Sequence, residues 1–269
     1  MSYLVVATAI CYAASLAGYV TFLATARREI GRAATVLLAV GIVVHYLALV
    51  ARSGQQGVLP YNDLYGSLSL FAWLLAVTYL GLELFHRQRS VGAFVMPVVL
   101  IVFGVSELGN RSAATPAPAG GALLALHITL NVLGYAAFAL SFVLSVIYLI
   151  QNRLLRNHRL GSIVWRFPAL EVLERMSRSS VLVGLASLGV GIGFGFLWMH
   201  RISGQYWNGD PKEVITLVIL AVYAGYLWLG RTTAWRGARA SALCVFNFVF
   251  VLFSYSVVNL YLSSFHRYF

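Results

Sequence analysis

The chain has 269 residues, of which 60% are hydrophobic and 10% charged, and its formal net charge is +11. A composition this apolar is typical of membrane proteins and argues against a soluble globular domain. The positive charge therefore needs an explanation other than nucleic-acid binding, and we expect no nucleic acid among the partners.

Eight apolar stretches reach or approach the roughly 20 residues that a helix needs to cross a bilayer. They cover residues 3–26, 33–51, 64–85, 91–106, 123–150, 180–199, 214–230 and 240–262. The fourth is short and contains Pro97, so its ends are the hardest to place. The pattern predicts a single all-α domain over residues 1–269, a polytopic membrane bundle of about eight helices. The first stretch lacks a basic start and a small-residue cleavage site, so we expect no cleavable signal peptide.

The basic residues support this count of spans. If eight spans alternate in direction, 14 of the 19 Lys and Arg residues fall in one set of loops and five in the other. Positive residues concentrate on the cytoplasmic side of membrane proteins. We therefore expect both termini on the extracytoplasmic face of a plasma or inner membrane, with the lipid bilayer as the surrounding medium.

The longest basic loop contains the segment RFPALEVLERMSRSS. Pro168 is suited to the first turn of a helix, and Leu170, Leu173 and Met176 would share one face of it. Residues 168–178 therefore favour an amphipathic helix on the cytoplasmic membrane surface, with a solvated linker as the alternative. Cys11 and Cys244 lie singly in apolar spans and are interpreted as small buried hydrophobes.

A polar island, GQYWNGDPKEV (204–214), stands between the sixth and seventh spans. Asp210 followed by Pro211 is a good start signal for the next helix, with Asp at the N-cap and Pro at the first helical position. Trp198, Tyr206 and Trp207 crowd the same level. Aromatic belts at membrane interfaces are common, but with histidine ligands these rings could also stack on a flat macrocycle.

The six histidines are His45, His86, His127, His158, His200 and His266. The predicted topology brings His127, His200 and His266 to one level on the extracytoplasmic side. Two neutral imidazoles that face each other can take the two axial positions of a haem iron. Zinc or copper is an alternative, although carboxylates are few on that side and no short His–His spacing occurs. His45 lies inside the second span and is either a second functional position or a neutral side chain bonded to a neighbouring helix.

Several blocks, in this order, resemble the CcsA-type cytochrome c assembly proteins, members of the haem-handling superfamily with a tryptophan-rich outer loop. The blocks are LPYNDLYGSLSLFAW, RSVGAFVMPVVL, LHITLNVLGYAAFALSFVLSVIYLIQNRLL, FPALEVLERMS, GQYWNGDPKE and VLFSYSVVNLYLSSFHRY. The resemblance extends over nearly the whole chain. It implies a membrane protein of cytochrome c biogenesis, of the system II type.

The resemblance also implies the site and the partners. His127 and His266 match the two outer histidines that hold the iron of haem b in this family. Trp207, Trp198 and Asp210 match the region that presents the porphyrin, and His45 matches a second, intramembrane haem region. The thiols of an apocytochrome c CxxCH segment would add to the haem vinyl groups, making the chain a component of a haem lyase. A CcsB-type partner with a large outer domain usually completes that enzyme.

The chain departs from the family pattern at four positions. Ser203 and Gly209 replace two of the three loop tryptophans, Trp228 stands where many lyases carry a histidine in the seventh span, and Gly66 replaces a common Glu. Two hypotheses follow: a divergent haem-lyase component, or a non-catalytic haem-binding or regulatory relative of the HemX type. An unrelated small-solute transporter is a third possibility.

Overall fold

A computed structural model describes residues 2–56, 63–109, 121–157, 167–207 and 209–257 of the chain. Within these residues the chain forms eight α-helices and two short 3-10 helices, and no β-strand. The α-helices are α1 (Ser2–Thr25), α2 (Arg28–Gln56), α3 (Leu64–His86), α4 (Gly92–Ser106), α5 (Gly121–Arg156), α6 (Leu170–Ser203), α7 (Pro211–Leu229) and α8 (Ala238–Val257). The 3-10 helices are η1 (Arg89–Val91) and η3 (Thr233–Trp235).

Seven of the described helices are long and apolar enough to cross a membrane, and the apolar part of α8, Ala238–Ser254, is shorter. Large apolar side chains are exposed along these helices: Val36 of α2 is 60% exposed and Ile101 of α4 is 66% exposed. Four tyrosines, by contrast, are completely buried between helices: Tyr12, Tyr19, Tyr79 and Tyr223. The predicted all-α polytopic membrane bundle is confirmed.

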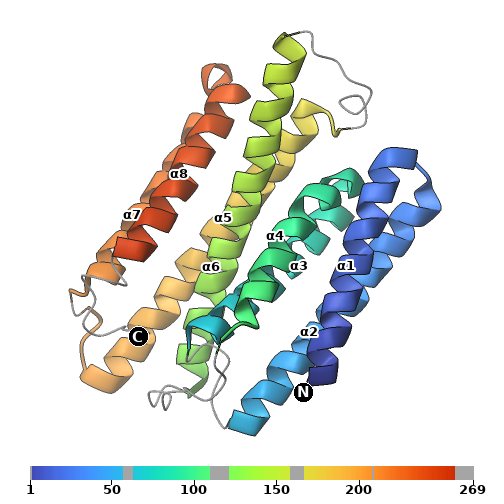
Figure 1. The fold of residues 1–269 in the computed structure, drawn as a ribbon. Coiled ribbons are helices and arrows are strands. Elements are labelled where there is room, and N and C mark those ends of the chain that lie inside the picture. Colours follow the sequence, from blue (N-terminus) through green and yellow to red (C-terminus); the bar gives the residue numbers. More distant parts are fainter. Residues whose placement is uncertain (1, 57–62, 110–120, 158–166, 208, 258–269) are drawn as a thin grey trace.

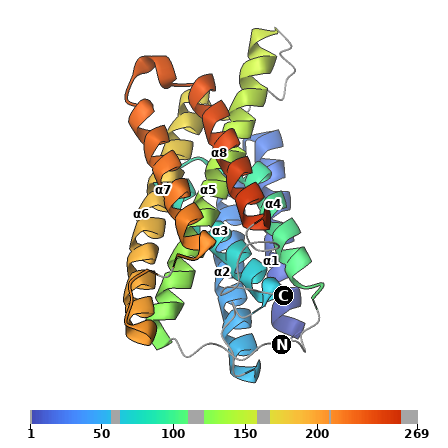
Figure 2. The ribbon, with the colours of Figure 1, turned by 90° about the vertical axis from the view of Figure 1, so that its left-hand side faces the viewer.

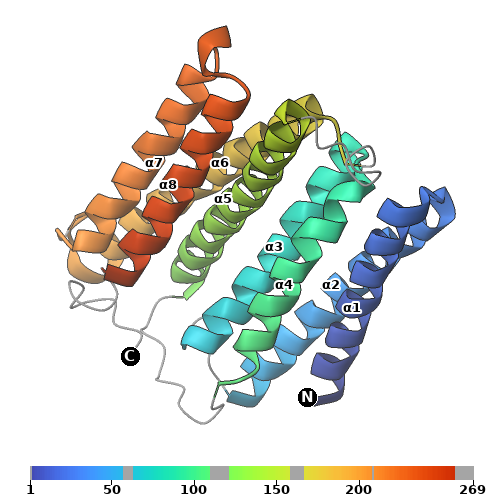
Figure 3. The same ribbon diagram turned by 45° about the horizontal axis from the view of Figure 1, so that its top comes forward.

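The helices form a row of four antiparallel pairs in chain order, α1/α2, α3/α4, α5/α6 and α7/α8 (Figures 1 and 3). Each pair packs against the next one in the row, through α1–α4 and α2–α3, then α3–α5, then α5–α8 and α6–α7. α1 begins at one end of the bundle, and α8 runs toward that same end (Figures 1 and 2). We call this end, where α5 begins and α6 and α7 are connected, the His127 end.

The other end is the basic end, which holds the α1–α2, α3–α4 and α7–α8 connections (Figure 1). Arg27, Arg87 and Arg236 lie in those connections, and Arg153 and Arg156 lie in the last turn of α5. In the described part of the chain, successive helices thus alternate in direction. The sequence argument about the unequal distribution of basic residues assumed this alternation.

Local sequence explains several helix boundaries. Asp63 caps α3 by accepting a hydrogen bond from the backbone N–H of Gly66 (2.7 Å), and it also pairs with Arg52 of α2 (3.0 Å). Asp210 caps α7 by accepting from the N–H of Lys212 (2.8 Å), with Pro211 in the first turn, as the sequence predicts. α6 ends at Gly204, whose φ of 73° is the left-handed conformation that glycine adopts at low cost.

The amphipathic segment 168–178 is not a separate surface helix, and that prediction is wrong. From Leu170 on, the segment forms the beginning of α6, which continues without a break to Ser203. The apolar face is explained by packing: Leu173 and Met176 are completely buried in the hydrophobic core rather than in lipid headgroups. A stripe of apolar residues on a helix has the same appearance whether it faces a membrane surface or a neighbouring helix.

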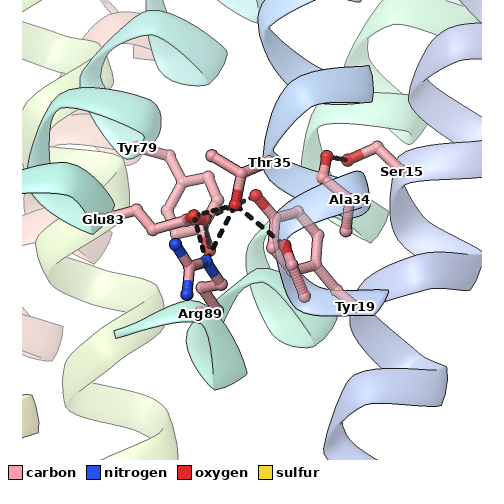
Figure 4. A network of polar contacts seen from close by, with 8 residues as sticks. Ser15, Tyr19, Ala34, Thr35, Tyr79, Glu83 and Arg89 are labelled. Atoms are coloured by element: carbon pink, nitrogen blue, oxygen red, sulfur yellow. Dashed lines mark hydrogen bonds and ion pairs between the residues drawn. The ribbon is translucent and has the colours of Figure 1, made fainter. Parts of the chain in front are cut away.

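A buried carboxylate joins the first two helix pairs near the basic end (Figure 4). Glu83 of α3 is only 1% exposed and accepts hydrogen bonds from the hydroxyl groups of Tyr19, Thr35 and Tyr79. Arg89 of η1 lies 3.7 Å from a Glu83 oxygen and donates to the Thr35 hydroxyl. Because α1, α2, α3 and η1 each contribute a partner, the carboxylate fixes their relative positions.

Removal of this carboxylate should destabilise the bundle. Glu83→Ala would leave three buried hydroxyl groups and a half-buried Arg89 without their shared partner, so we expect the free energy of unfolding to fall by about 3 kcal/mol. Unfolding by a denaturing detergent measures it, with Glu29→Ala as the matched control because that carboxylate is exposed at the start of α2. Equal effects of the two substitutions would show that Glu83 does not hold the helices together.

Candidate functional site

His127 lies in the second turn of α5, at the end of the bundle where α6 and α7 are connected. Its half-buried imidazole faces α6, with Nδ1 2.7 Å from the backbone carbonyl oxygen of Gly191. A carbonyl oxygen can only accept, so Nδ1 is the protonated nitrogen of the neutral ring. The other nitrogen, Nε2, then carries the lone pair that can bind a metal ion.

Two glycines of α6 make room for this arrangement. A Cβ atom at Gly195 would lie 2.5 Å from Nδ1 of His127, and one at Gly191 would lie 2.4 Å from Oδ1 of Asn131. Both distances are shorter than carbon atoms tolerate. The two glycines are four residues apart, as are His127 and Asn131, so one face of α5 fits against one face of α6.

Asn131 is a site residue that the sequence reasoning missed. Its side-chain nitrogen lies 3.2 Å from Nε2 and 3.3 Å from Nδ1 of His127. Its oxygen, Oδ1, is buried and has no hydrogen-bond partner among the described residues. The available signal was a polar residue one turn after His127 on the same face of an otherwise apolar helix.

Trp198 lies in the α5–α6 interface, three residues after Gly195 on α6. It is 6% exposed and packs in a small cluster with Leu124 and Met199, against which Ile128 also packs. Its indole nitrogen, Nε1, is buried and has no hydrogen-bond partner in the described part of the chain. Among the described residues, the α5–α6 interface therefore contains a donor on Trp198 and an acceptor on Asn131 that have no hydrogen-bond partner.

The connection from α6 to α7 carries further aromatic rings at this end. Trp207 is 40% exposed, and its ring centroid lies 6.2 Å from that of Phe196 on α6. Tyr206 stacks on His200 with a centroid distance of 4.1 Å. Asp210 is 7% exposed and caps α7. Trp198, Trp207 and Asp210 thus share the His127 end.

His45 belongs to a different part of the molecule. It is completely buried, between α1, α3 and α4, with Nδ1 3.1 Å from the Tyr12 hydroxyl and Nε2 3.0 Å from the Ser69 hydroxyl. Its ring also makes an edge contact with Phe103 (centroids 4.9 Å apart). Because both ring nitrogens have hydroxyl partners, this geometry matches the structural alternative, a neutral histidine bonded to neighbouring helices.

Two further positions complete the comparison with the sequence. His266 lies outside the described residues, so its predicted place opposite His127 stays a prediction. Trp228, where many lyases have a histidine, is 68% exposed on α7, in keeping with a lipid-facing side chain rather than a ligand inside the bundle.

The donors near His127 fit a porphyrin iron better than a bare metal ion. The described residues contain no cluster of three or more His, Cys, Asp or Glu side chains that could hold a metal. Zinc sites need about four protein ligands, whereas haem iron needs only one or two axial ligands from the protein. A histidine whose second nitrogen donates to a backbone carbonyl is the usual arrangement of a metal-ligating imidazole.

These features define a polytopic helical membrane protein with a histidine site at one end of its longest helix pair. The family model described as "Cytochrome C assembly protein" matches residues 61–266, a range that includes both His127 and His266. The chain belongs to this family.

Proteins of two names are among those to which the chain is similar. "Cytochrome c biogenesis protein CcsA" of Synechococcus sp. (strain CC9605) is 31% identical over 86% of this chain and 85% of its own length. The protein of that name from Guillardia theta is 28% identical over 89% and 85%. "Protein HemX" of Brevibacillus brevis is 27% identical over 96% of this chain and 95% of its own length.

The effect on stability of substituting a glycine of α6 should depend on which face of the helix that glycine occupies. Gly195→Ala would push the His127 ring out of its place, and we expect it to destabilise the protein by about 1–3 kcal/mol. Gly193→Ala is the matched control, since a Cβ there meets no atom within 4 Å. Alanine has the higher helix propensity, so the control should be neutral or stabilising by up to about 1 kcal/mol. Detergent-induced unfolding distinguishes the two, and a tolerated Gly195→Ala would contradict the close contact.

Proposed function

We propose that this protein takes part in cytochrome c biogenesis by binding haem b through His127 and His266 and presenting it for attachment to apocytochrome c. One observation carries the proposal: His127 Nδ1 donates to the Gly191 carbonyl oxygen over 2.7 Å, the usual arrangement of an imidazole that ligates a metal through its other nitrogen, Nε2. The family membership supplies the biological context. The relatives named "Cytochrome c biogenesis protein CcsA" support it.

Haem would supply two vinyl groups, and across each of them one thiol of a CxxCH segment adds, with the sulfur bonding to one carbon and the hydrogen to the other. This addition needs no oxidant. The part of this chain is to bind and orient. His127 and His266 would fix the iron, while Trp198 and Trp207 would offer apolar surface near it.

We further propose an orientation in the membrane. The basic end would face the cytoplasm and the His127 end the extracytoplasmic side, because positive residues concentrate on the cytoplasmic side. Residues 2 and 257 would then both lie on the extracytoplasmic side of a plasma or inner membrane. A CcsB-type partner with an outer domain would dock there and bring the apocytochrome.

The alternative is a haem-binding or regulatory relative without lyase activity. Two observations favour it: Ser203 and Gly209 stand where the family loop has tryptophans, and the match to the HemX protein covers 96% of the chain. Each lost aromatic ring removes about 0.5–1.5 kcal/mol of stacking beyond area burial. Expression with a CcsB-type partner and a CxxCH reporter separates the two functions: covalent haem on the reporter supports a lyase, and bound haem without transfer supports the alternative.

Haem binding should depend on the imidazoles of His127 and His266 and not on that of His200. We expect the protein purified from haem-replete cells to contain haem, and His127→Ala and His266→Ala each to lower the bound amount at least tenfold, since an axial ligand to iron is lost. His200→Ala is the control, because this exposed imidazole at the same end already stacks on Tyr206. Optical spectra of the reduced proteins measure bound haem.

The haem assignment would be refuted by a wild-type protein without haem. It would also be refuted by a His127→Ala, His266→Ala double variant that retains the wild-type spectrum.

The orientation can be tested with single cysteines at exposed positions. In a Cys11→Ala, Cys244→Ala background, Ser203→Cys should react with a membrane-impermeant maleimide added to intact cells, because it lies at the His127 end. Thr232→Cys, at the basic end, should react only after the cells are opened. Both positions are exposed, so access to the reagent is the only difference between them. The reverse pattern would invert the proposed orientation.

A further inference from the structure

The imidazole of His127 contacts the side-chain amide of Asn131. Neither the helical structure of α5 nor a hydrogen-bond network requires an amide at this position. The Asn131 side-chain nitrogen is almost equally far from the two ring nitrogens, 3.2 Å and 3.3 Å. Cε1 lies between those nitrogens on one side of the ring and the Cγ–Cδ2 bond lies on the other, so an atom equidistant from both nitrogens lies either over the ring face or in the ring plane. At these distances a position in the plane would overlap ring carbon atoms. The amide therefore lies against the face of the imidazole.

The other side of the Asn131 amide is confined by α6. Its oxygen faces Gly191, where even one added carbon would approach to 2.4 Å. Asn131 thus fills the space between the His127 ring and the α6 backbone. The ring is then held in two independent ways: the Gly191 carbonyl binds Nδ1, and the Asn131 amide covers one face and resists rotation about the Cβ–Cγ bond.

Burial of the Asn131 amide in this space costs free energy. A residue that served only to pack α5 against α6 would not incur this cost. Asn131 Oδ1 is buried and has no hydrogen-bond partner among the described residues, and a buried unpaired polar atom costs about 1–3 kcal/mol. A leucine would fill similar space on α5 without that cost. An amide at this position is therefore explained better by what its nitrogen does to the imidazole than by helix packing.

We propose that Asn131 is a positioning residue for haem binding, which holds the His127 ring in one orientation so that Nε2 is directed to the iron. The inference rests on the proposed function of His127. Partners of this kind, which contact a metal ligand but not the metal, typically contribute 10–100-fold to metal affinity. The orientation of the imidazole plane also affects the electronic structure of the low-spin ferric iron that it binds.

The test compares two buried asparagines. Asn131→Ala should lower haem affinity about 10-fold or more and should shift or split the low-spin electron paramagnetic resonance signal of the ferric protein. Asn247→Ala is the matched control: Asn247 of α8 is 1% exposed, its amide has no partner in the described part of the chain, and it lies on a different helix from His127. It should leave the signal and the affinity unchanged. Equal effects of the two substitutions would overturn the inference, because Asn131 would then act only through packing.

A second measurement needs no substitution at Asn131 and no haem. In nuclear magnetic resonance spectra of the haem-free protein, the Asn131 side-chain amide protons should lie upfield, because they sit over an aromatic ring, and His127→Ala should abolish that shift. An unshifted amide would overturn the contact itself. If the amide is shifted but the wild-type protein never binds haem, the proposed function fails while the contact stands. If haem binds through His127 and only the Asn131 effect is missing, the positioning role alone fails.

Discussion

The close approach of α5 and α6 is the constraint on which the candidate site depends. Glycines on both helices permit it: Gly134 of α5 lies against Gly184 and Leu188, and Gly184, Gly191 and Gly195 of α6 accommodate Phe138, Asn131 and His127. In a membrane, where burial of apolar surface adds little to helix association, small residues that let backbones come close are a main source of packing energy. The site is therefore built by the same contacts that hold the pair together.

The chemistry of His127 follows from this packing. Only because α6 presents bare backbone does a carbonyl oxygen come within 2.7 Å of Nδ1. That single hydrogen bond selects the tautomer, and the tautomer determines which nitrogen can bind iron. The first two helix pairs have a separate polar interior, in which Glu83 and His45 have their own hydroxyl partners. The buried polar groups thus fall into two sets. Those around Glu83 and His45 hold helices together, and those around His127 are suited to a ligand.

The sequence was sufficient for features that are local or compositional. Apolar runs predicted the helices, and Asp210 with Pro211 predicted the start of α7, because a cap depends on residues within one turn. It was insufficient for features that depend on which helices become neighbours. Leu173 and Met176 suggested a membrane-surface helix, since an apolar stripe does not say what covers it. Asn131, Gly191 and Gly195 were not recognised, because their roles exist only once α5 lies against α6.

An experimental density map of the protein purified from haem-replete cells tests the central claim most directly. The account predicts flat density at the His127 end of the bundle, bounded on one side by Nε2 of His127 and on the other by the imidazole of His266, with Nδ1 of His127 still on the Gly191 carbonyl. Imidazoles that point apart, or that lie at opposite ends of the bundle, would contradict it and leave only the helical fold.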